Sequence, residues 1–226
     1  MFSIESINKV ISSTLYSKAL SVAQHYEKST DLFKPYKVVD QVTISVASAN
    51  EGSVIRGETL ISQCTVDEIV PLLTTADTKT RQIFDENTKS ITEVGKFSTE
   101  EGNWSVRHYV VTSPSMMVSE RDFLYVERYF DVKPEVSDAK KTTILLTTSI
   151  DEALDIKPAK GHVRGTNIFT YLKFTELNNG DLRATFIAQA APNGYIPTAI
   201  ANSVVYVRPL LLSLSAKQLG KNCTAC

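Results

Sequence analysis

The C-terminal region carries the longest helical repeat of apolar residues in the chain. The positions that recur every third or fourth residue are Ile196, Ile200, Ser203, Val204, Val207, Leu211 and Leu214. This spacing predicts one helix of about twenty residues with a single apolar face. Pro192, Asn193 and Gly194 stand just before it and predict a sharp turn. Pro209 falls inside the repeat, so we expect a kink, with a bend near Val205.

The N-terminal third of the chain combines helical and alternating patterns. Apolar residues at helical spacing predict a helix over residues 4–27. Alternation then predicts a strand at 37–47 and a partner at 53–62, joined by a turn at 50–52. Thr65 and Glu68 have the spacing of a capping box and predict a helix start, while Pro71 predicts that this helix is short or kinked.

Beyond residue 85 the pattern alternates almost to the C-terminal repeat. It predicts strands at 90–98, 103–112, 122–132, 142–151, 161–175 and 181–190. Gly102 and the Asn179-Gly180 pair mark turns between them. Consecutive strands joined by short turns pair as neighbours, which predicts a curved antiparallel sheet. Wrapped around the long C-terminal helix, this sheet makes an α+β helix-grip fold, whose concave face is either filled by side chains or left as a hollow apolar cavity.

Composition narrows the class of protein. The chain has 226 residues, 42% of them hydrophobic, and a net charge of −1. We expect one domain over residues 1–226, with its core at 4–219 and a disordered tail at 220–226. Near-neutral charge argues against nucleic acid as a partner and against a strongly electrostatic grip on anionic membranes. No apolar run is long enough to span a membrane, and no secretory signal pattern is present. A mitochondrial presequence stays open as an alternative to a mature N-terminal helix.

The three cysteines predict no disulfide framework, which fits a reducing compartment and a cytoplasmic protein. The last four residues, Cys223-Thr224-Ala225-Cys226, fit the C-a-a-X pattern for prenylation of Cys223. A Cys-x-x-Cys thiol pair and an unstructured tail are the alternatives.

Four short motifs lie in order along the chain. They are Arg81-Gln82-Ile83-Phe84-Asp85, Val118-Ser119-Glu120-Arg121-Asp122-Phe123, Gly161-His162-Val163-Arg164-Gly165, and the stretch from Pro192 to Asn202. Together they resemble motifs of the START family of StAR-related lipid-transfer domains. The departures are Phe84 and Tyr195, where the family usually has Trp, and Asn193, where it has Gly. Spacing and order are similar over residues 4–219.

The resemblance implies a hollow helix-grip domain that takes up one lipid, a sterol or a phospholipid, and transfers it between membranes. It implies no cofactor, only transient membrane contact, and a monomer. The terminal helix and adjacent loops act as a lid in that family. The residues expected at the lid and mouth are Tyr195, Ile196, Ile200, Asn202 and Val204.

Arg121 and His108 are the polar pair expected in the cavity. In the family, the arginine of the second motif often points inward and meets an acidic residue of the preceding strand. His108 stands where that acid commonly stands. His108 would then accept a hydrogen bond from Arg121 or bind a ligand hydroxyl; alternatively it is only packed. Asp122 or Glu127 could be the partner of Arg121 instead.

Met116 and Met117 lie in a loop between two predicted strands. Exposed there, they would insert shallowly into a membrane interface; the alternative is that both pack beneath the loop. Arg81 and Asp85, four residues apart, predict an ordinary ion pair on a helix surface. The aromatic residues that either line the cavity or serve as packing are Trp104, Tyr109, Tyr125 and Tyr129.

Candidate catalytic chemistry is sparse. His25, His108 and His162 fall in different elements without metal-ligand spacing, and no nucleophile elbow or phosphate-binding loop occurs. We therefore expect no enzyme and no metal site. Two other functions stay open: an enzyme on the same scaffold, such as a cyclase, hydrolase or thioesterase-like protein, and a signalling module that senses its lipid.

Overall fold

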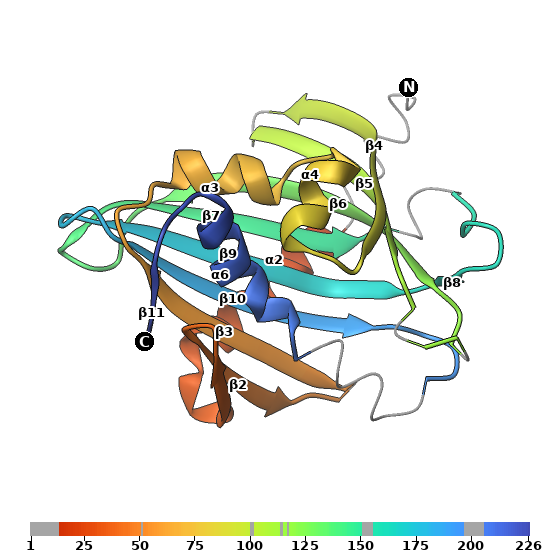
Figure 1. Cartoon of the computed structure of the whole chain (residues 1–226), viewed down its shortest axis with the longest axis horizontal. Helices are drawn as coiled ribbons and strands as arrows, with labels where there is room; N and C mark the ends of the chain where they lie inside the picture. Colours follow the sequence, from red (N-terminus) through yellow and green to blue (C-terminus); the bar gives the residue numbers. More distant parts are fainter. Residues whose placement is uncertain are drawn as a thin grey trace.

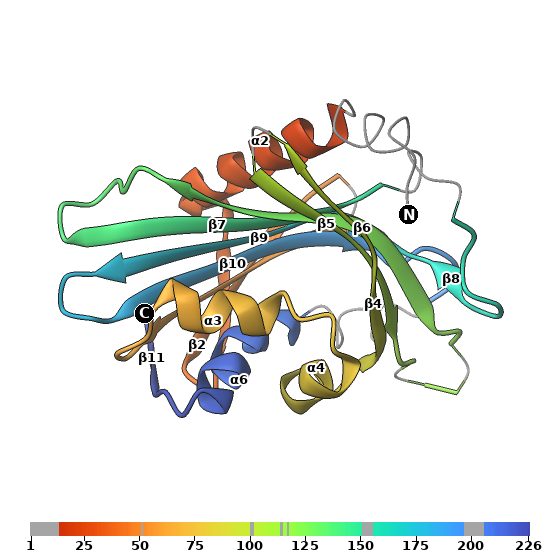
Figure 2. The same ribbon diagram turned by 90° about the horizontal axis from the view of Figure 1, so that it is seen from above.

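The computed structural model describes residues 14–50, 52–99, 102–113, 115–116, 118–150, 156–196 and 206–226. In this part of the chain, strands form one curved, largely antiparallel 11-stranded sheet with short helices on both faces (Figures 1 and 2). The main strands run in the order β1-β2-β3-β10-β9-β7-β6-β5-β4, while β11 pairs with β3 and β8 pairs with β6. The strands are β1 (Lys34–Val39), β2 (Val42–Ser48), β3 (Ser53–Ile61), β4 (Thr88–Thr99), β5 (Gly102–Val111), β6 (Arg121–Val132), β7 (Ala139–Ser149), β8 (Val163–Arg164), β9 (Thr166–Leu177), β10 (Leu182–Ala191) and β11 (Cys223–Ala225).

The predicted meander of six strands is confirmed: β4, β5, β6, β7, β9 and β10 pair in that order. Two predicted strands are each divided in two. The segment 37–47 contains the end of β1 and most of β2, because Asp40 and Gln41 both have left-handed φ angles, 47° and 62°, and reverse the chain. The segment 161–175 is divided at Gly165, between β8 and β9.

The two faces of the sheet bury separate apolar clusters. The outer face packs against α2 (Thr14–Lys28), and the inner face is covered by α3 (Val66–Leu73), α4 (Thr78–Phe84) and α6 (Leu211–Gln218) (Figure 2). Strand alternation divides the side chains between them. In β6, Leu124 and Val126 join the outer cluster with α2, whereas Tyr125 and Glu127 point toward the inner face. The functional consequence is that odd and even residues of β6 serve different sites.

The predicted helix starts agree with the structure where it describes them. Residues 4–13 of the predicted N-terminal helix lie outside the described part. Its remainder corresponds to α2, which runs from Thr14 to Lys28. At α3, the Glu68 carboxylate accepts the Thr65 backbone N–H at 2.9 Å, completing the capping box. With Pro71 inside it, α3 has only 8 residues, as expected.

The C-terminal region differs from the prediction of a helix of about twenty residues. Its described part is a 3-10 turn, η2 (Arg208–Leu210), followed by the 8-residue α6. Pro209 lies in the first turn of this unit, where its missing N–H leaves no helical hydrogen bond broken, so it precedes α6 rather than kinking it. Pro209 also packs on β3: a Cβ on Gly57 would lie 2.3 Å from the Pro209 Cβ. The expected bend near Val205 lies outside the described residues.

Residues 220–226, expected to be a disordered tail, contain strand β11. The physical reason is an unpaired sheet edge. β2 pairs with β3 only as far as Glu58, and β11 continues from Thr59 to Ile61. The last backbone groups of β3 thereby gain partners.

Candidate functional site

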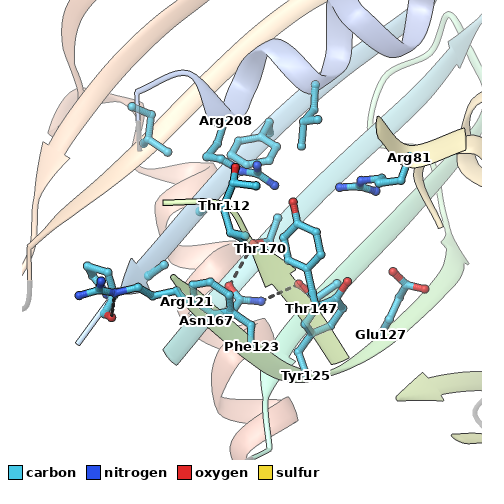
Figure 3. Close-up of a pocket in the computed structure, with 18 of the residues that line it drawn as sticks. Arg81, Thr112, Arg121, Phe123, Tyr125, Glu127, Thr147, Asn167, Thr170 and Arg208 are labelled. Carbon is cyan, nitrogen blue, oxygen red and sulfur yellow. Dashed lines mark hydrogen bonds between the residues drawn. The ribbon is translucent and has the colours of Figure 1, made fainter. Parts of the chain in front are cut away.

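A cavity of about 220 Å³ lies between the inner face of the sheet and its covering helices (Figure 3). Its walls are mainly apolar, with a small number of charged and hydroxyl groups. The apolar side chains that line it include Ile55, Leu73, Val111, Phe123, Leu145, Leu172 and Phe186. The charged ones are Arg81, Arg121, Glu127 and Arg208. An apolar chamber with a few placed polar groups has the character of a small-molecule site.

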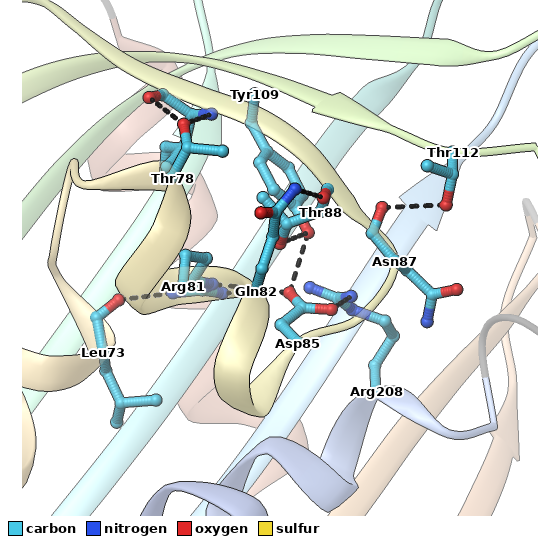
Figure 4. A network of polar contacts seen from close by, with 11 residues as sticks. Leu73, Thr78, Arg81, Gln82, Asp85, Asn87, Thr88, Tyr109, Thr112 and Arg208 are labelled. Carbon is cyan, nitrogen blue, oxygen red and sulfur yellow. Dashed lines mark hydrogen bonds and ion pairs between the residues drawn. The ribbon is translucent and has the colours of Figure 1, made fainter.

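One wall of the cavity is built around Asp85, at the end of α4 (Figure 4). Its Oδ2 accepts a hydrogen bond from the Tyr109 hydroxyl at 2.7 Å and faces the Arg81 Nε at 3.4 Å. Its Oδ1 accepts from the Arg208 guanidinium at 3.1 Å. Arg81 also donates to the Leu73 carbonyl at 2.6 Å. The cluster therefore ties α3, α4, β5 and the C-terminal turn together.

Electrostatics explains why Asp85 stays ionised there. Burial by itself would raise its pKa, but Arg208, Arg81 and the Tyr109 hydroxyl outweigh that effect and lower the pKa to about 2. Arg81 and Asp85 are 8% and 3% exposed. The sequence prediction of an ordinary helix-surface pair is therefore wrong: the pair is buried, because the face of α4 that carries it points at the sheet and not at solvent.

A second buried ion pair joins Glu127 of β6 to Arg107 of β5. The Arg107 Nε and Nη2 both lie 3.3 Å from the Glu127 Oε1. Arg107 also donates to Glu93 and to the Thr74 carbonyl, each at 2.8 Å. Burial raises the pKa of Glu127 to about 7 in spite of the neighbouring arginine. This carboxyl group titrates near neutrality while it lines the cavity.

Arg121, the first residue of β6, lies at the cavity wall and is 7% exposed. Its Nε donates to the Pro192 carbonyl at 3.1 Å and its Nη2 to the Asn193 carbonyl at 2.9 Å. Its Nη1 donates to the Ser119 carbonyl. Arg121 thus faces inward as expected, but it holds main-chain carbonyls where the family pattern has an acid. Desolvation by burial lowers its pKa.

His108 is placed differently from the expectation that it faces the cavity with Arg121. Its Nε2 lies 2.7 Å from the Asp122 Oδ2, and Asp122 is fully buried. Arg164 and the Ala159 backbone N–H bind the same carboxylate. Strand alternation is the reason: Tyr109, next to His108, lines the cavity, so His108 faces the opposite side of the sheet. Asp122 belongs to this outer cluster and is not a partner of Arg121.

The turn at residues 192–196, called the lid turn after the lid that the resemblance implies, lies at one end of the cavity. Pro192 and Ile196 line it, whereas Tyr195 is 88% exposed. Asn193 and Gly194 have left-handed φ angles of 51° and 63°, which produce the predicted sharp turn. Three other expected lid residues, Ile200, Asn202 and Val204, lie outside the described residues.

The loop between β5 and β6 reaches the same end of the cavity. Its residues Val118 and Ser119 line the cavity, and Met116 is fully exposed. Met116 therefore does not pack beneath the loop, whereas Met117 lies outside the described residues. Two exposed apolar side chains, Met116 and Tyr195, accordingly stand on the two chain segments that Arg121 joins.

Strand parity separates Trp104 from the three tyrosine candidates, which share the inner face. Tyr109 and Tyr125 line the cavity, and burial raises the pKa of both hydroxyls. Trp104 packs on the outer face, with its ring centroid 4.5 Å from that of Tyr16 in α2. Tyr129 is 49% exposed and lies beyond the cavity.

Several residues of the site, in the cavity wall or behind it, were not singled out from the sequence. Arg208 interrupts an apolar stretch of the C-terminal repeat. A lone charged residue at such a position could have indicated a buried ion pair, which Arg208 makes with Asp85. Arg107 differs in that its partners come from three elements, which no local pattern reveals. Asn167 and Thr147, which share a hydrogen bond of 2.7 Å in the cavity wall, read as ordinary strand residues.

The part of the chain that the structure describes contains no group of three His, Cys, Asp or Glu side chains that could hold a metal ion. The described residues also include no helix that is long and apolar enough to cross a membrane. Cys64, Cys223 and Cys226 are free thiols, and burial raises the pKa of Cys64 to about 11, which leaves it poorly reactive.

This chain is similar to known proteins both in sequence and in structure. A sequence profile described as the START domain matches residues 76–223, more than half of the chain. Human StAR-related lipid transfer protein 5 superposes with a TM-score of 0.76 at 19% identity, over 93% of this chain and 98% of that one. Human STARD10 gives 0.69 at 16% identity, over 87% and 76%.

A third similar structure is a fragment, residues 25–204, of a StAR-related lipid transfer protein from Xanthomonas axonopodis. It gives a TM-score of 0.64 at 20% identity, over 84% of this chain and 99% of that one. None of the curated protein sequences matches this chain significantly. At such identities the superpositions establish the fold, and the profile match is independent of them.

Proposed function

Because the chain belongs to the START domain family, we propose that it binds a single lipid molecule in the inner cavity and transfers it between membranes. The observation that carries this proposal is the apolar cavity itself, closed at one end by a turn and a loop that both present exposed apolar side chains. Two of the similar structures, one human and one from Xanthomonas axonopodis, are named as StAR-related lipid transfer proteins, which points to the same activity. The cargo we propose is a sterol or a phospholipid.

The energetics of the cavity support transfer without an energy source. Each buried CH₂ group gains roughly 0.8 kcal/mol on leaving water, so a lipid is almost insoluble in water. It exchanges at little net cost between a bilayer and an apolar cavity, because both environments lack water. The slow step is then the opening of the cavity, which the protein controls through its lid.

The size of the cavity supports such an opening. Its volume is about 220 Å³, below the roughly 300–1,000 Å³ of typical small-molecule sites. A whole sterol or phospholipid therefore needs the cavity to widen. The contacts of Arg121 with the Pro192 and Asn193 carbonyls are the bonds that would have to break at that end.

We propose that the membrane contact is made by Met116 together with Tyr195. Both side chains are exposed, and both flank the end of the cavity that Arg121 closes. Shallow insertion of these apolar groups would place the cavity end against the lipid headgroups. We propose that the protein works as a monomer.

An enzymatic role is less well supported. It would need an acid and a base free to act on a ligand. Asp85 and Glu127 are both bound to arginine side chains in the structure. These carboxylates act first as counter-charges that keep the buried arginines in place.

The direct test is native mass spectrometry of the purified protein, combined with uptake of fluorescent sterol and phospholipid from donor vesicles. We expect one lipid per chain and delivery of that lipid to acceptor vesicles. Absence of any bound lipid, together with no uptake of either class, would refute the proposal. Uptake without delivery would favour a lipid sensor over a transfer protein.

A further inference from the structure

Arg121 is a buried cation whose contacts are all with neutral acceptors. The Pro192, Asn193 and Ser119 carbonyls accept its three hydrogen bonds. No carboxylate of the described residues pairs with it, and its pKa is lowered by desolvation with no charged neighbour opposing that change. The other cavity arginines differ, because Arg81 and Arg208 share Asp85. An unbalanced buried charge is costly, and an anion is what would relieve that cost.

The position of this charge is equally specific. Figure 3 draws Arg121 at one side of the cavity and Arg81 and Glu127 at the other. Between them lie Phe123, Tyr125 and the hydrogen-bonded set of Asn167, Thr147 and Thr170. Arg121 bonds the two segments that carry the exposed side chains of Met116 and Tyr195. A protein resting on a membrane through these two side chains would bring Arg121 to the level of the headgroups.

On the basis of the lipid-binding function proposed above, we propose that Arg121 binds the phosphate of a phospholipid headgroup and, in doing so, releases the lid turn. A guanidinium presents a planar fork that matches phosphate oxygens. Hydrogen bonds to an anionic acceptor are roughly twice as strong as those to a neutral carbonyl. A phosphate at Arg121 therefore displaces the Pro192 and Asn193 carbonyls. The turn is then held by the Asn193 side chain, which donates to the Arg164 carbonyl and the Thr166 Oγ1, each at 3.0 Å, and it moves more readily. The cargo then enters with its chains in the apolar wall and its phosphate at Arg121.

The test compares two lipids that differ only in the phosphate: phosphatidic acid and diacylglycerol with identical, fluorescently labelled acyl chains. Binding is measured from vesicles of neutral lipid at one fixed ionic strength. We expect the wild-type protein to bind phosphatidic acid about tenfold or more tighter than diacylglycerol. Arg121→Gln should lose this preference and Arg121→Lys should keep part of it. Arg183→Gln is the matched control, because it removes the same charge from an exposed position on β10 and should keep the full preference.

Failure of this proposal is distinguishable from failure of lipid binding itself. Equal binding of both lipids by the wild type, or an unchanged preference in Arg121→Gln, would overturn the phosphate site and leave lipid binding intact. If neither these lipids nor a sterol binds, both proposals fall. Glycerol 3-phosphate is a further arm: if it competes with phosphatidic acid as well as unlabelled phosphatidic acid does, the site is for a free phosphate and the proposed lipid headgroup is refuted.

A second measurement does not depend on how well the Arg121 variants fold. Hydrogen exchange of the Asn193, Gly194 and Tyr195 amides is followed in the wild type with vesicles containing either lipid. We expect faster exchange with phosphatidic acid than with diacylglycerol, because the phosphate frees the turn. Equal exchange rates would show that phosphate does not release the turn.

Discussion

Replacing Asp85 by Asn tests whether the cavity wall depends on one buried negative charge. The substitution keeps the shape of the side chain but leaves Arg81 and Arg208 facing each other without a counter-charge. Removing one partner of a buried ion pair costs about 3–5 kcal/mol. In a chain of this size, 1 kcal/mol corresponds to roughly 2–4 °C in melting temperature. We therefore expect Asp85→Asn to melt at least about 6 °C lower at neutral pH.

The pH dependence of this loss is a sharper test than its size. The pKa of Asp85 is lowered from 3.8 to about 2 on folding. A carboxyl group with a lower pKa in the folded state stabilises the protein above its unfolded pKa, and this contribution disappears as the pH falls toward its folded pKa. The contribution is about 2 kcal/mol in total, of which about 1 kcal/mol is lost by pH 3. The gap in unfolding free energy between wild type and Asp85→Asn should shrink accordingly.

The assay is urea denaturation of both proteins at pH 6, 4 and 3. Asp67→Asn is the control, since its carboxylate is 87% exposed and binds Lys141 only at the surface; it should cost below about 1 kcal/mol at every pH. A loss for Asp85→Asn as small as that of the control would contradict the buried cluster. A gap as large at pH 3 as at pH 6 would contradict the lowered pKa.

Three further predictions use different parts of the molecule. Burial raises the pKa of Glu127 to about 7. As the pH rises from 4.5 to 7, the unfolding free energy of the wild type should therefore fall relative to that of Glu127→Gln, by up to roughly 3 kcal/mol. Parallel curves of unfolding free energy against pH, from urea titrations of the two proteins, would contradict this. Gly57→Ala should destabilise the protein by about 1–3 kcal/mol in thermal or urea unfolding, because its Cβ collides with Pro209, and wild-type stability would show that the C-terminal turn does not rest on β3. Met116→Ser should slow lipid exchange with vesicles while leaving the melting temperature unchanged. The control Val38→Ser replaces an exposed apolar side chain on β1 and should leave the exchange rate unchanged. If Met116→Ser exchanges lipid as fast as the wild type, Met116 is not part of the membrane contact.

Local patterns predicted most of the elements. Alternation of apolar residues placed the six meander strands, because each strand has one face in an apolar cluster and side chains repeat every second residue. The capping box at Thr65 and the Asn179-Gly180 turn also act over a few residues, and both occur as expected. Arg121, expected at the cavity from the motif at residues 118–123, lies in its wall.

Predictions that depended on partners from distant segments of the chain were less accurate. His108 was assigned to the cavity from its position relative to Arg121 in the family pattern. The assignment is wrong because the face of a strand depends on register, and a one-residue difference reverses it. Arg81 and Asp85 have helix-surface spacing, yet Tyr109 and Arg208 bury them from two other elements. The tail at 220–226 became a strand because β2 ends before β3 does.

The sequence by itself determined most of the strands, the turns between them and the family. These depend on neighbouring side chains and on motifs a few residues long. The tertiary structure alone decided which charges meet. Asp85 receives two arginines and Glu127 receives one. Within the described part of the chain, Arg121 receives only main-chain carbonyls, from the lid turn and from the loop between β5 and β6. Burial removes the water that would otherwise solvate each charge, so its partner is fixed by whichever segment folds against it.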